Sequence, residues 1–146
     1  MKKLIYMIAA ALLMAAGCQK DETRTLEQIS GEWHYTATES GVTEDVYLSF
    51  SADGVFEMYQ KVGDGPYWFS SGEYRLDAES MVLSGVYTDR YPWKYSYKIY
   101  VNEKTLTMTA VELEGYSVVY SRESIPAQVR QMSLPLTRSG EVEFFL

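Results

Sequence analysis

Alternation of apolar and polar residues dominates the chain from Gly31 to Glu123. Apolar side chains recur at every second position in short runs, and turn-forming residues interrupt the runs about every 8 to 12 residues, as in sandwiches and barrels. A period of two is typical of antiparallel strands that bury one face. No helical period and no internal repeat is sustained. The pattern predicts eight strands, at about residues 31–39, 44–51, 55–62, 67–76, 81–87, 93–102, 105–113 and 116–123.

Two of these runs show the alternation most clearly. Val46, Leu48 and Phe50 share one face of the second run, and polar residues or tyrosine occupy the other. In the seventh run, Leu106 and Met108 alternate with threonines. Because each strand has one apolar face to cover, we expect the strands to surround a shared interior.

The links between the runs indicate which end of the molecule is open. Three links are short and rich in turn residues, namely 51–54, 77–80 and 102–104. Those around Ser40-Gly41, 63–66 and 88–92 are expected to be looser or longer. Since alternate links of an up-and-down meander lie at opposite ends, the fold class predicted is an all-β, eight-stranded antiparallel up-and-down barrel. Such a barrel leaves room for side chains or one small ligand.

A short helix is expected after the eighth strand. Ser124 suits its cap and Pro126 its first turn, and the helix should run to about Met132. The barrel domain then covers residues 30–132. Residues 133–146 form a C-terminal tail, whose apolar end can contact the barrel wall at a place that the sequence does not define.

The beginning of the chain has the composition of an export signal. Lys2 and Lys3 precede an apolar segment of 13 residues, 4–16. This segment is too short to cross a hydrocarbon layer of ~30 Å as a stable helix, and it fits a secretory signal.

Ala15-Ala16-Gly17-Cys18 follows and resembles a lipobox, in which a diacylglyceryl group is attached to the cysteine before cleavage. The resemblance implies removal of the signal peptide, residues 1–17, and a lipidated tether at 18–29. The alternative is an ordinary signal peptide with a free or buried cysteine. Cys18 is the single cysteine, so a disulfide within the chain is excluded.

The four residues after Cys18, Gln-Lys-Asp-Glu, resemble the surface-export signal of Bacteroidota lipoproteins. This likeness implies an outer-membrane protein that is exposed on the cell surface and held by its acyl chains. The alternative is a solvated linker, for which charged residues would serve equally well.

Composition narrows the class of protein further. The 146 residues suffice for one domain, and an aromatic content of 14%, with 13 tyrosines, favours β-structure. The net charge of −7 argues against nucleic acid as a partner, because phosphate attraction requires a basic face. Acidity also has a simpler role, which is to keep a surface protein soluble.

Gly31-Glu32-Trp33 opens the first strand and Arg122 ends the eighth. With eight meandering strands and a short helix behind them, residues 31 to about 132 resemble the lipocalin fold, and in style the small lipocalin-like lipoproteins of Bacteroidota. The resemblance implies that the Trp of a Gly-x-Trp motif lies across the closed base and that an Arg stacks on it. The strand order places both residues at the closed end. A guanidinium over an indole contributes ~0.5–2 kcal/mol.

No catalytic constellation is evident in the sequence. His34 is the only histidine, so a Ser-His-Asp triad would depend on it, and an incidental surface histidine is the simpler interpretation. With no second histidine and no cysteine in the barrel, Cys/His chemistry and histidine-based zinc sites are unavailable. Carboxylates such as Glu44 and Glu112 fall in turns and are most simply solvated. We therefore expect no enzyme activity, no metal and no cofactor.

The stronger signal is aromatic. Flat rings gather at the expected open end, where they can stack on sugars or line an apolar entry. The hypothetical binding site consists of Tyr67, Trp68, Tyr87, Tyr91, Trp93 and Tyr95. The alternative is that half of these rings fill the upper layer of the barrel. The sequence thus predicts a surface-anchored, lipocalin-like lipoprotein that binds a small apolar or saccharide ligand. The alternative function is a structural or accessory subunit of an outer-membrane complex, with a filled barrel.

Overall fold

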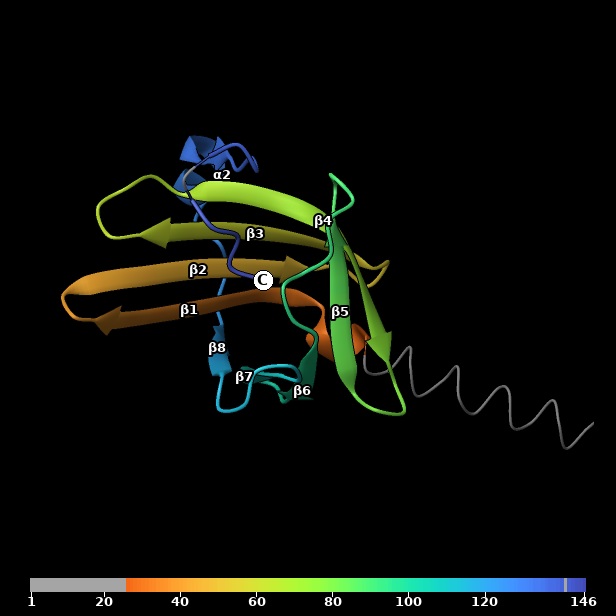
Figure 1. Ribbon diagram of the computed structural model, residues 1–146. Coiled ribbons are helices and arrows are strands. Elements are labelled where there is room, and N and C mark those ends of the chain that lie inside the picture. Colours follow the sequence, from red (N-terminus) through yellow and green to blue (C-terminus); the bar gives the residue numbers. More distant parts are fainter. Residues whose placement is uncertain (1–25, 141) are drawn as a thin grey trace, which may run out of the picture.

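The computed structural model describes residues 26–140 and 142–146, and within them the chain forms a closed barrel of eight antiparallel strands (Figure 1). The predicted fold class is confirmed, and the expected signal peptide and Cys18 lie outside the described residues. The strands are β1 Gly31–Glu39, β2 Val42–Phe50, β3 Val55–Val62, β4 Trp68–Asp77, β5 Val82–Tyr87, β6 Tyr97–Val101, β7 Thr105–Ala110 and β8 Ser117–Arg122. A short helix, α2 Ala127–Met132, and a two-residue strand, β9 Leu134–Pro135, follow.

Each of the eight main strands pairs with its neighbours in sequence, and β1 pairs with β8 to close the barrel. The β1–β8 junction is short, because only Trp33 and His34 pair, with Arg122 and Ser121. By contrast β1 and β2 pair along their whole length of nine residues. The barrel therefore has a half of long strands, β1–β4, whose ends reach beyond the shorter half, β5–β8 (Figure 1).

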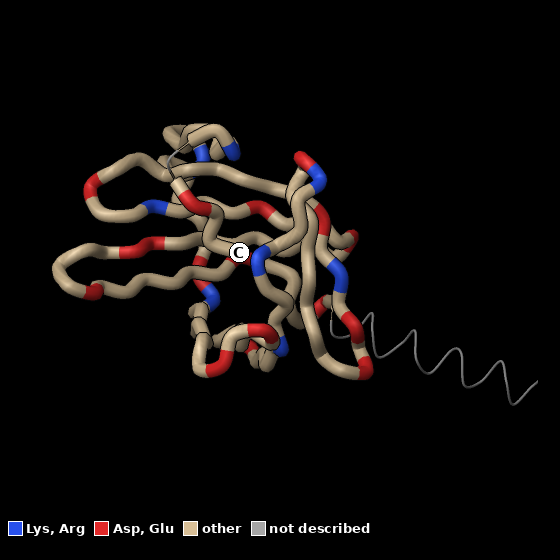
Figure 2. The backbone as a smooth tube through the Cα atoms, in the orientation of Figure 1, with Lys and Arg blue, Asp and Glu red and all other residues tan. Residues whose placement is uncertain are grey.

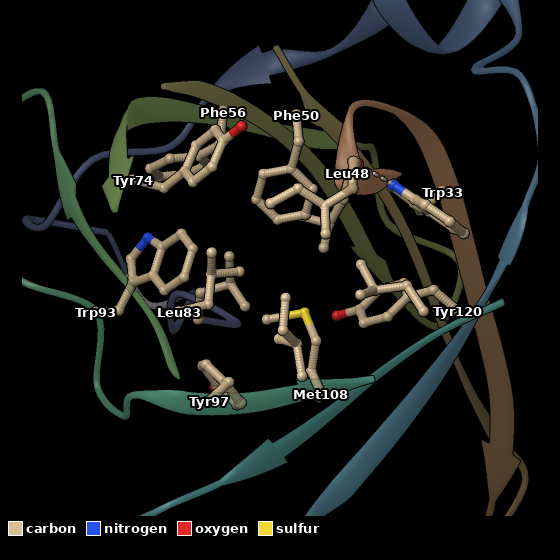
Figure 3. Close-up of a cluster of buried hydrophobic side chains, with 14 of the residues drawn as sticks. Trp33, Leu48, Phe50, Phe56, Tyr74, Leu83, Trp93, Tyr97, Met108 and Tyr120 are labelled. Atoms are coloured by element: carbon tan, nitrogen blue, oxygen red, sulfur yellow. Dashed lines mark hydrogen bonds between the residues drawn. The ribbon is translucent and has the colours of Figure 1, made fainter. Parts of the chain in front are cut away.

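The inward-facing side chains form one hydrophobic core. Val46, Leu48 and Phe50 point inward from β2, as the alternation predicts, and are at most 1% exposed. Figure 3 shows aromatic and aliphatic side chains from strands on all sides of the barrel meeting in the middle. Three large aromatic side chains, Trp33, Tyr97 and Tyr120, are among the most deeply buried. The core of the barrel is therefore packed with side chains.

A second, smaller cluster lies outside the barrel wall. Tyr47 and Tyr59 face outward from β2 and β3, yet both are buried, because Ile125 and Val129 of the segment around α2 cover them. Arg130 of α2 also forms salt bridges with carboxylates on β1 and β3. The helix is thus fixed to the outer face of the long half.

Four sequence expectations need correction. Ser124 does not cap the helix, which begins at Ala127 directly after Pro126 and has no side-chain cap. The seventh strand ends at Ala110 instead of 113, because the following residues form a turn closed by a hydrogen bond from Tyr116 to Leu113.

The link at Ser40-Gly41 is not loose: it is a two-residue hairpin turn in which both residues have positive φ, 52° and 81°. The sixth strand is shorter than predicted, because residues 93–96 leave the β-ladder although Trp93 still points into the core. The other links keep the predicted order, with short ones at one end, the base, and longer ones at the other end, the mouth.

Candidate functional site

The base of the barrel is closed by Trp33 and the residues just before it. The Trp33 side chain is fully buried, and its indole Nε1 donates a hydrogen bond of 2.8 Å to the carbonyl of Ile29. Residues 26–29 form a helical turn, and Ile29 is itself part of the core. The Arg122 guanidinium carbon lies 4.1 Å from the centre of the Trp33 ring. The closed end thus has the arrangement that the lipocalin resemblance implies.

Arg122 also fastens the neighbouring backbone. Its guanidinium donates to the carbonyls of Gln28, Ser30 and Glu103 at 2.9 to 3.0 Å. Gly31 makes this possible, because a Cβ at that position would lie 2.6 Å from Nη1 of Arg122. Its φ of +125° is also one that other residues rarely adopt.

The mouth of the barrel is closed by the chain itself. Residues 142–146, here called the plug, run back over the opening, and the chain end lies within the outline of the barrel (Figure 1). Leu146 is 2% exposed and belongs to the core. The ring of Phe144 lies 4.6 Å from that of Tyr87, and the ring of Phe145 lies 5.9 Å from that of Tyr35. The apolar end of the tail is therefore an integral part of the packed mouth.

Two buried polar side chains of the barrel hold the backbone of the plug. Gln60, 3% exposed, donates from Nε2 to the carbonyl of Glu143 at 2.6 Å and accepts at Oε1 from the N–H of Phe145 at 3.1 Å. The Tyr87 hydroxyl donates to the carbonyl of Leu146 at 2.8 Å. Burial raises the pKa of Tyr87, so its hydroxyl stays a neutral donor.

Arg138 connects the tail to the rim of the mouth. Its guanidinium carbon lies 4.1 Å from the Phe144 ring centre and 4.2 Å from that of Tyr91. Nε donates to the Asp89 carboxylate at 2.6 Å. Hydrogen bonds from Arg138 hold the pKa of Asp89 below its usual value.

Of the six aromatic residues in the hypothetical binding site, the structure brings two together. Tyr87 and Tyr91 both contact Arg138 at the mouth, where Tyr87 is buried and Tyr91 is 59% exposed. Trp68 is half-buried and lines a separate crevice of about 320 Å³ with tail residues.

The other three rings lie elsewhere. Trp93 is buried in the core, 5.1 Å from the ring of Phe56, and directly over Gly85, where a Cβ would come within 2.2 Å of its indole. Tyr95 packs against the core on the side of Tyr97 and Tyr116. Tyr67 lies on the outer wall and donates a hydrogen bond to Asp45. The six rings therefore do not line one pocket.

Two larger crevices lie on either side of Arg138 and Phe144. One, of about 440 Å³, is lined by these two residues together with Tyr87, Lys94 and Glu143 among others. The other, of about 370 Å³, lies between β4 and the β5–β6 loop and includes Ser70 in its lining. The Ser70 hydroxyl is buried and has no hydrogen-bond partner within residues 26–140 and 142–146. Both crevices combine aromatic walls with polar groups.

Sequence reasoning missed Gln60, Arg138 and the place of the plug. One signal was present: Gln60 continues the inward-facing series of Phe56 and Met58, so a polar side chain was due to enter the barrel. A buried amide requires hydrogen-bond partners. The partners lie 83 and 85 residues away, which no local pattern reveals.

His34 occupies a structural position on the outer wall. Its ring stacks on Tyr47 at 4.2 Å and forms hydrogen bonds with Asp45 and Glu123. In the part of the chain that the structure describes, no three His, Cys, Asp or Glu side chains are grouped closely enough to hold a metal ion. No helix in that part is long and apolar enough to span a membrane. Charged residues of both signs are distributed over the loops and strands (Figure 2).

Comparisons with known proteins support the fold alone. No protein-family model matches the sequence, and no curated protein matches it. Among solved structures, the chain is similar to the NMR structure of a protein from Bacteroides uniformis ATCC 8492, with a TM-score of 0.51 and 13% sequence identity. The similarity covers 66% of this chain and 90% of that one. It shows that a Bacteroides protein shares the fold.

Proposed function

We propose that this chain is a lipid-anchored protein of the bacterial cell surface that binds a small apolar or saccharide ligand at the open end of a lipocalin-like barrel. The observation that carries the proposal is the construction of the mouth. Buried Gln60 and Tyr87 present hydrogen-bonding groups among aromatic rings, and the chain's own apolar residues occupy this site. Ligand sites commonly combine an apolar lining with a few placed polar groups in this way.

The two ligand classes fit different parts of the mouth. An apolar ligand would take the place of Phe144 and Leu146, because the interior below them is packed. A saccharide would instead lie in the crevices beside Arg138, where aromatic walls and polar groups alternate. The role proposed is binding without chemical conversion.

Indole N–H signals in an NMR spectrum of the full chain test this proposal, because Trp68 lines a crevice with tail residues, Trp93 lies in the core and Trp33 closes the base. Titration with fatty acids and with neutral oligosaccharides should shift the signal of Trp68 at the rim. The signal of Trp33, hydrogen-bonded inside the base, should stay unchanged. A panel that leaves Trp68 unshifted at millimolar concentration would contradict ligand binding at the mouth.

The proposed anchor is tested separately. Cys18 lies where the lipobox resemblance puts the acylated residue. We expect a Cys18→Ser variant to leave the membrane fraction, and protease added to intact cells should digest the unchanged chain but spare an intracellular control. A variant that stays membrane-bound would contradict the anchor.

A second candidate function, an accessory subunit of an envelope complex, is favoured by the packed interior and by an exposed row on the outer face of the short half. Tyr100, Thr107 and Val119 are neighbours across β6, β7 and β8, and Tyr100 and Val119 are 69% and 54% exposed. A photo-crosslinking residue at position 100 should then give one specific adduct on cells. A Val119→Glu substitution should abolish that adduct.

A further inference from the structure

Side chains at the mouth form hydrogen bonds with the backbone of the plug, which indicates that the mouth can bind a peptide segment. We infer that the mouth is a binding site for an extended segment of another protein, with two aromatic residues followed by an aliphatic one, and that the plug occupies this site in cis. The inference goes beyond the proposed function, because it concerns a protein partner and does not require a small ligand.

Main-chain recognition is the first argument. The Gln60 amide donates to the carbonyl of Glu143 and accepts from the N–H of Phe145, so one side chain pairs with the backbone as a neighbouring strand would. Tyr87 adds a bond to the carbonyl of Leu146. All three bonds address groups that every peptide carries, with proline as the exception at the Phe145 position. Peptide-binding sites of this kind draw affinity from the main chain and preference from side-chain contacts.

Side-chain contacts supply that preference. Phe144 packs edge-on against Tyr87 and lies under Arg138, while Phe145 packs against Tyr35. Leu146 enters the core and is 2% exposed. The Glu143 side chain, by contrast, is exposed. The partner segment should therefore resemble Phe-Phe-Leu, with a free choice of residue before it.

The binding groups belong to the barrel, and the plug both pairs and covers them. Gln60 and Tyr87 are each 3% exposed with the plug in place. Loss of the plug would open these groups and the apolar side chains around Leu146 to water, whereas exchange of one segment for another preserves every bond and keeps the apolar surface covered. This favours replacement of the plug by a competing peptide over simple opening.

The connection to the plug permits such an exchange. Residues 137–140 are exposed and end in Gly140, and their turn is closed by a backbone bond of 3.2 Å from Gly140 to Thr137. The salt bridge between Arg138 and Asp89 lies at the surface. Release of the plug therefore breaks no pairing of β1–β8. A tethered segment has an effective concentration near the millimolar range, so weakening the plug should strengthen binding of a peptide in trans.

Binding of a fluorescent peptide, Ser-Gly-Glu-Val-Glu-Phe-Phe-Leu, to the full chain tests the inference. In a Phe144→Ser/Phe145→Ser variant the plug should hold poorly, and we expect this variant to bind the peptide at least tenfold more tightly than the unchanged chain. N-methylation of the second phenylalanine removes the N–H that donates to Gln60. The methylated peptide should therefore bind at least fivefold more weakly. Adding Gln60→Leu to the variant should remove the gain.

The Trp33 indole signal reports whether each variant retains the closed base, and only variants that retain it are compared. Absence of peptide binding to the double variant would overturn the inference, as would equal binding of the methylated peptide. A concentration-dependent dimer of the unchanged chain with exchanged plugs would assign the site to a second copy and overturn the choice of another protein. A Trp68 shift with small ligands but no peptide binding would overturn this inference and leave the proposed function intact.

Discussion

The two ends of the barrel are closed by the same device but from different distances in the sequence. At the base, Trp33 and Arg122 bind the carbonyls of residues 28–30, which directly precede β1. At the mouth, Gln60 and Tyr87 bind the backbone of residues 143–146, which arrive after α2 and β9. In both places side chains of the barrel capture the main chain of a flanking segment.

The chemistry of the two closures differs. The base uses a charged guanidinium that donates to three carbonyls while stacking on an indole, and charged hydrogen bonds are the stronger kind. At the mouth the hydrogen bonds to the plug backbone come from a neutral amide and a neutral phenol, whereas the charged Arg138 stacks on Phe144 and pairs with Asp89. Charged hydrogen bonds to the adjacent residues 28–30 suit a permanent closure of the base. Neutral hydrogen bonds to the distant plug suit a closure in which the plug can be exchanged.

The base should be the most sensitive point of the molecule. Trp33→Ala removes a fully buried indole and its bond to Ile29, and we expect a loss of about 3–5 kcal/mol in the free energy of unfolding. Denaturant titration measures the loss. The matched control, Trp68→Ala at the half-buried rim, should cost much less. Equal costs at the two positions would contradict the contrast between base and mouth.

The charge of Arg122 alone should not suffice. Lysine keeps the charge but cannot reach three carbonyls with one planar group, so Arg122→Lys should cost about 2 kcal/mol of stability. Thermal or denaturant unfolding measures it, and protease sensitivity of residues 26–30 should rise. A lysine variant as stable as the unchanged chain would show that charge, rather than geometry, closes the base.

At the mouth the expected global effect is smaller and more local. Gln60→Leu removes two hydrogen bonds to the plug and should cost about 1 kcal/mol. Hydrogen exchange at the Phe145 amide should accelerate while that of Trp33 stays slow. Ser70→Ala is the control, because this buried hydroxyl has no partner among the described residues and its removal should cost nothing. Faster exchange at both ends would argue against independent closures.

Acid should loosen the mouth slightly and leave the base unaffected. Since Arg138 lowers the pKa of Asp89, the contribution of their salt bridge is complete above the unfolded pKa of about 4 and is lost as the pH falls through the lowered value. NMR signals of Gly140 and Phe144 should therefore move below about pH 4. Asp89→Asn should abolish that movement, and its persistence in the variant would exclude this salt bridge as the cause.

The arrangement of the closed base could be predicted from the sequence, but the arrangement of the mouth could not. Period-two alternation fixed the strands and their inward faces, and the Gly31-Glu32-Trp33 motif with Arg122 indicated the closed end, because these residues lie on strands whose order follows from short links. The plug depends instead on contacts between β3 and residues more than 80 positions later. Alternation describes which face a side chain occupies, but it carries no information about such a partner.

The six aromatic residues of the hypothetical binding site show a second limit of prediction from the sequence. Rings at the starts of strands were expected to share one mouth, yet Tyr67 lies on the outer wall and Trp93 lies in the core. Tyr67 is partly buried there because it packs against the outer cluster of Tyr47 and Tyr59, which the segment around α2 covers, and no pattern within the strands predicts that cover.

The position of the closed base determines how the molecule would sit on a lipid surface. The chain enters the barrel there, and an acyl group on Cys18 would be joined to buried Ile29 by eleven residues, a reach of at most roughly 40 Å. That end would then face the bilayer, and the opposite end would point into the medium. A partner that approaches such a protein from outside would first meet the turn at Ser40-Gly41 and the loop at 63–67, which reach beyond the short half, and then the rim around Arg138 and Tyr91.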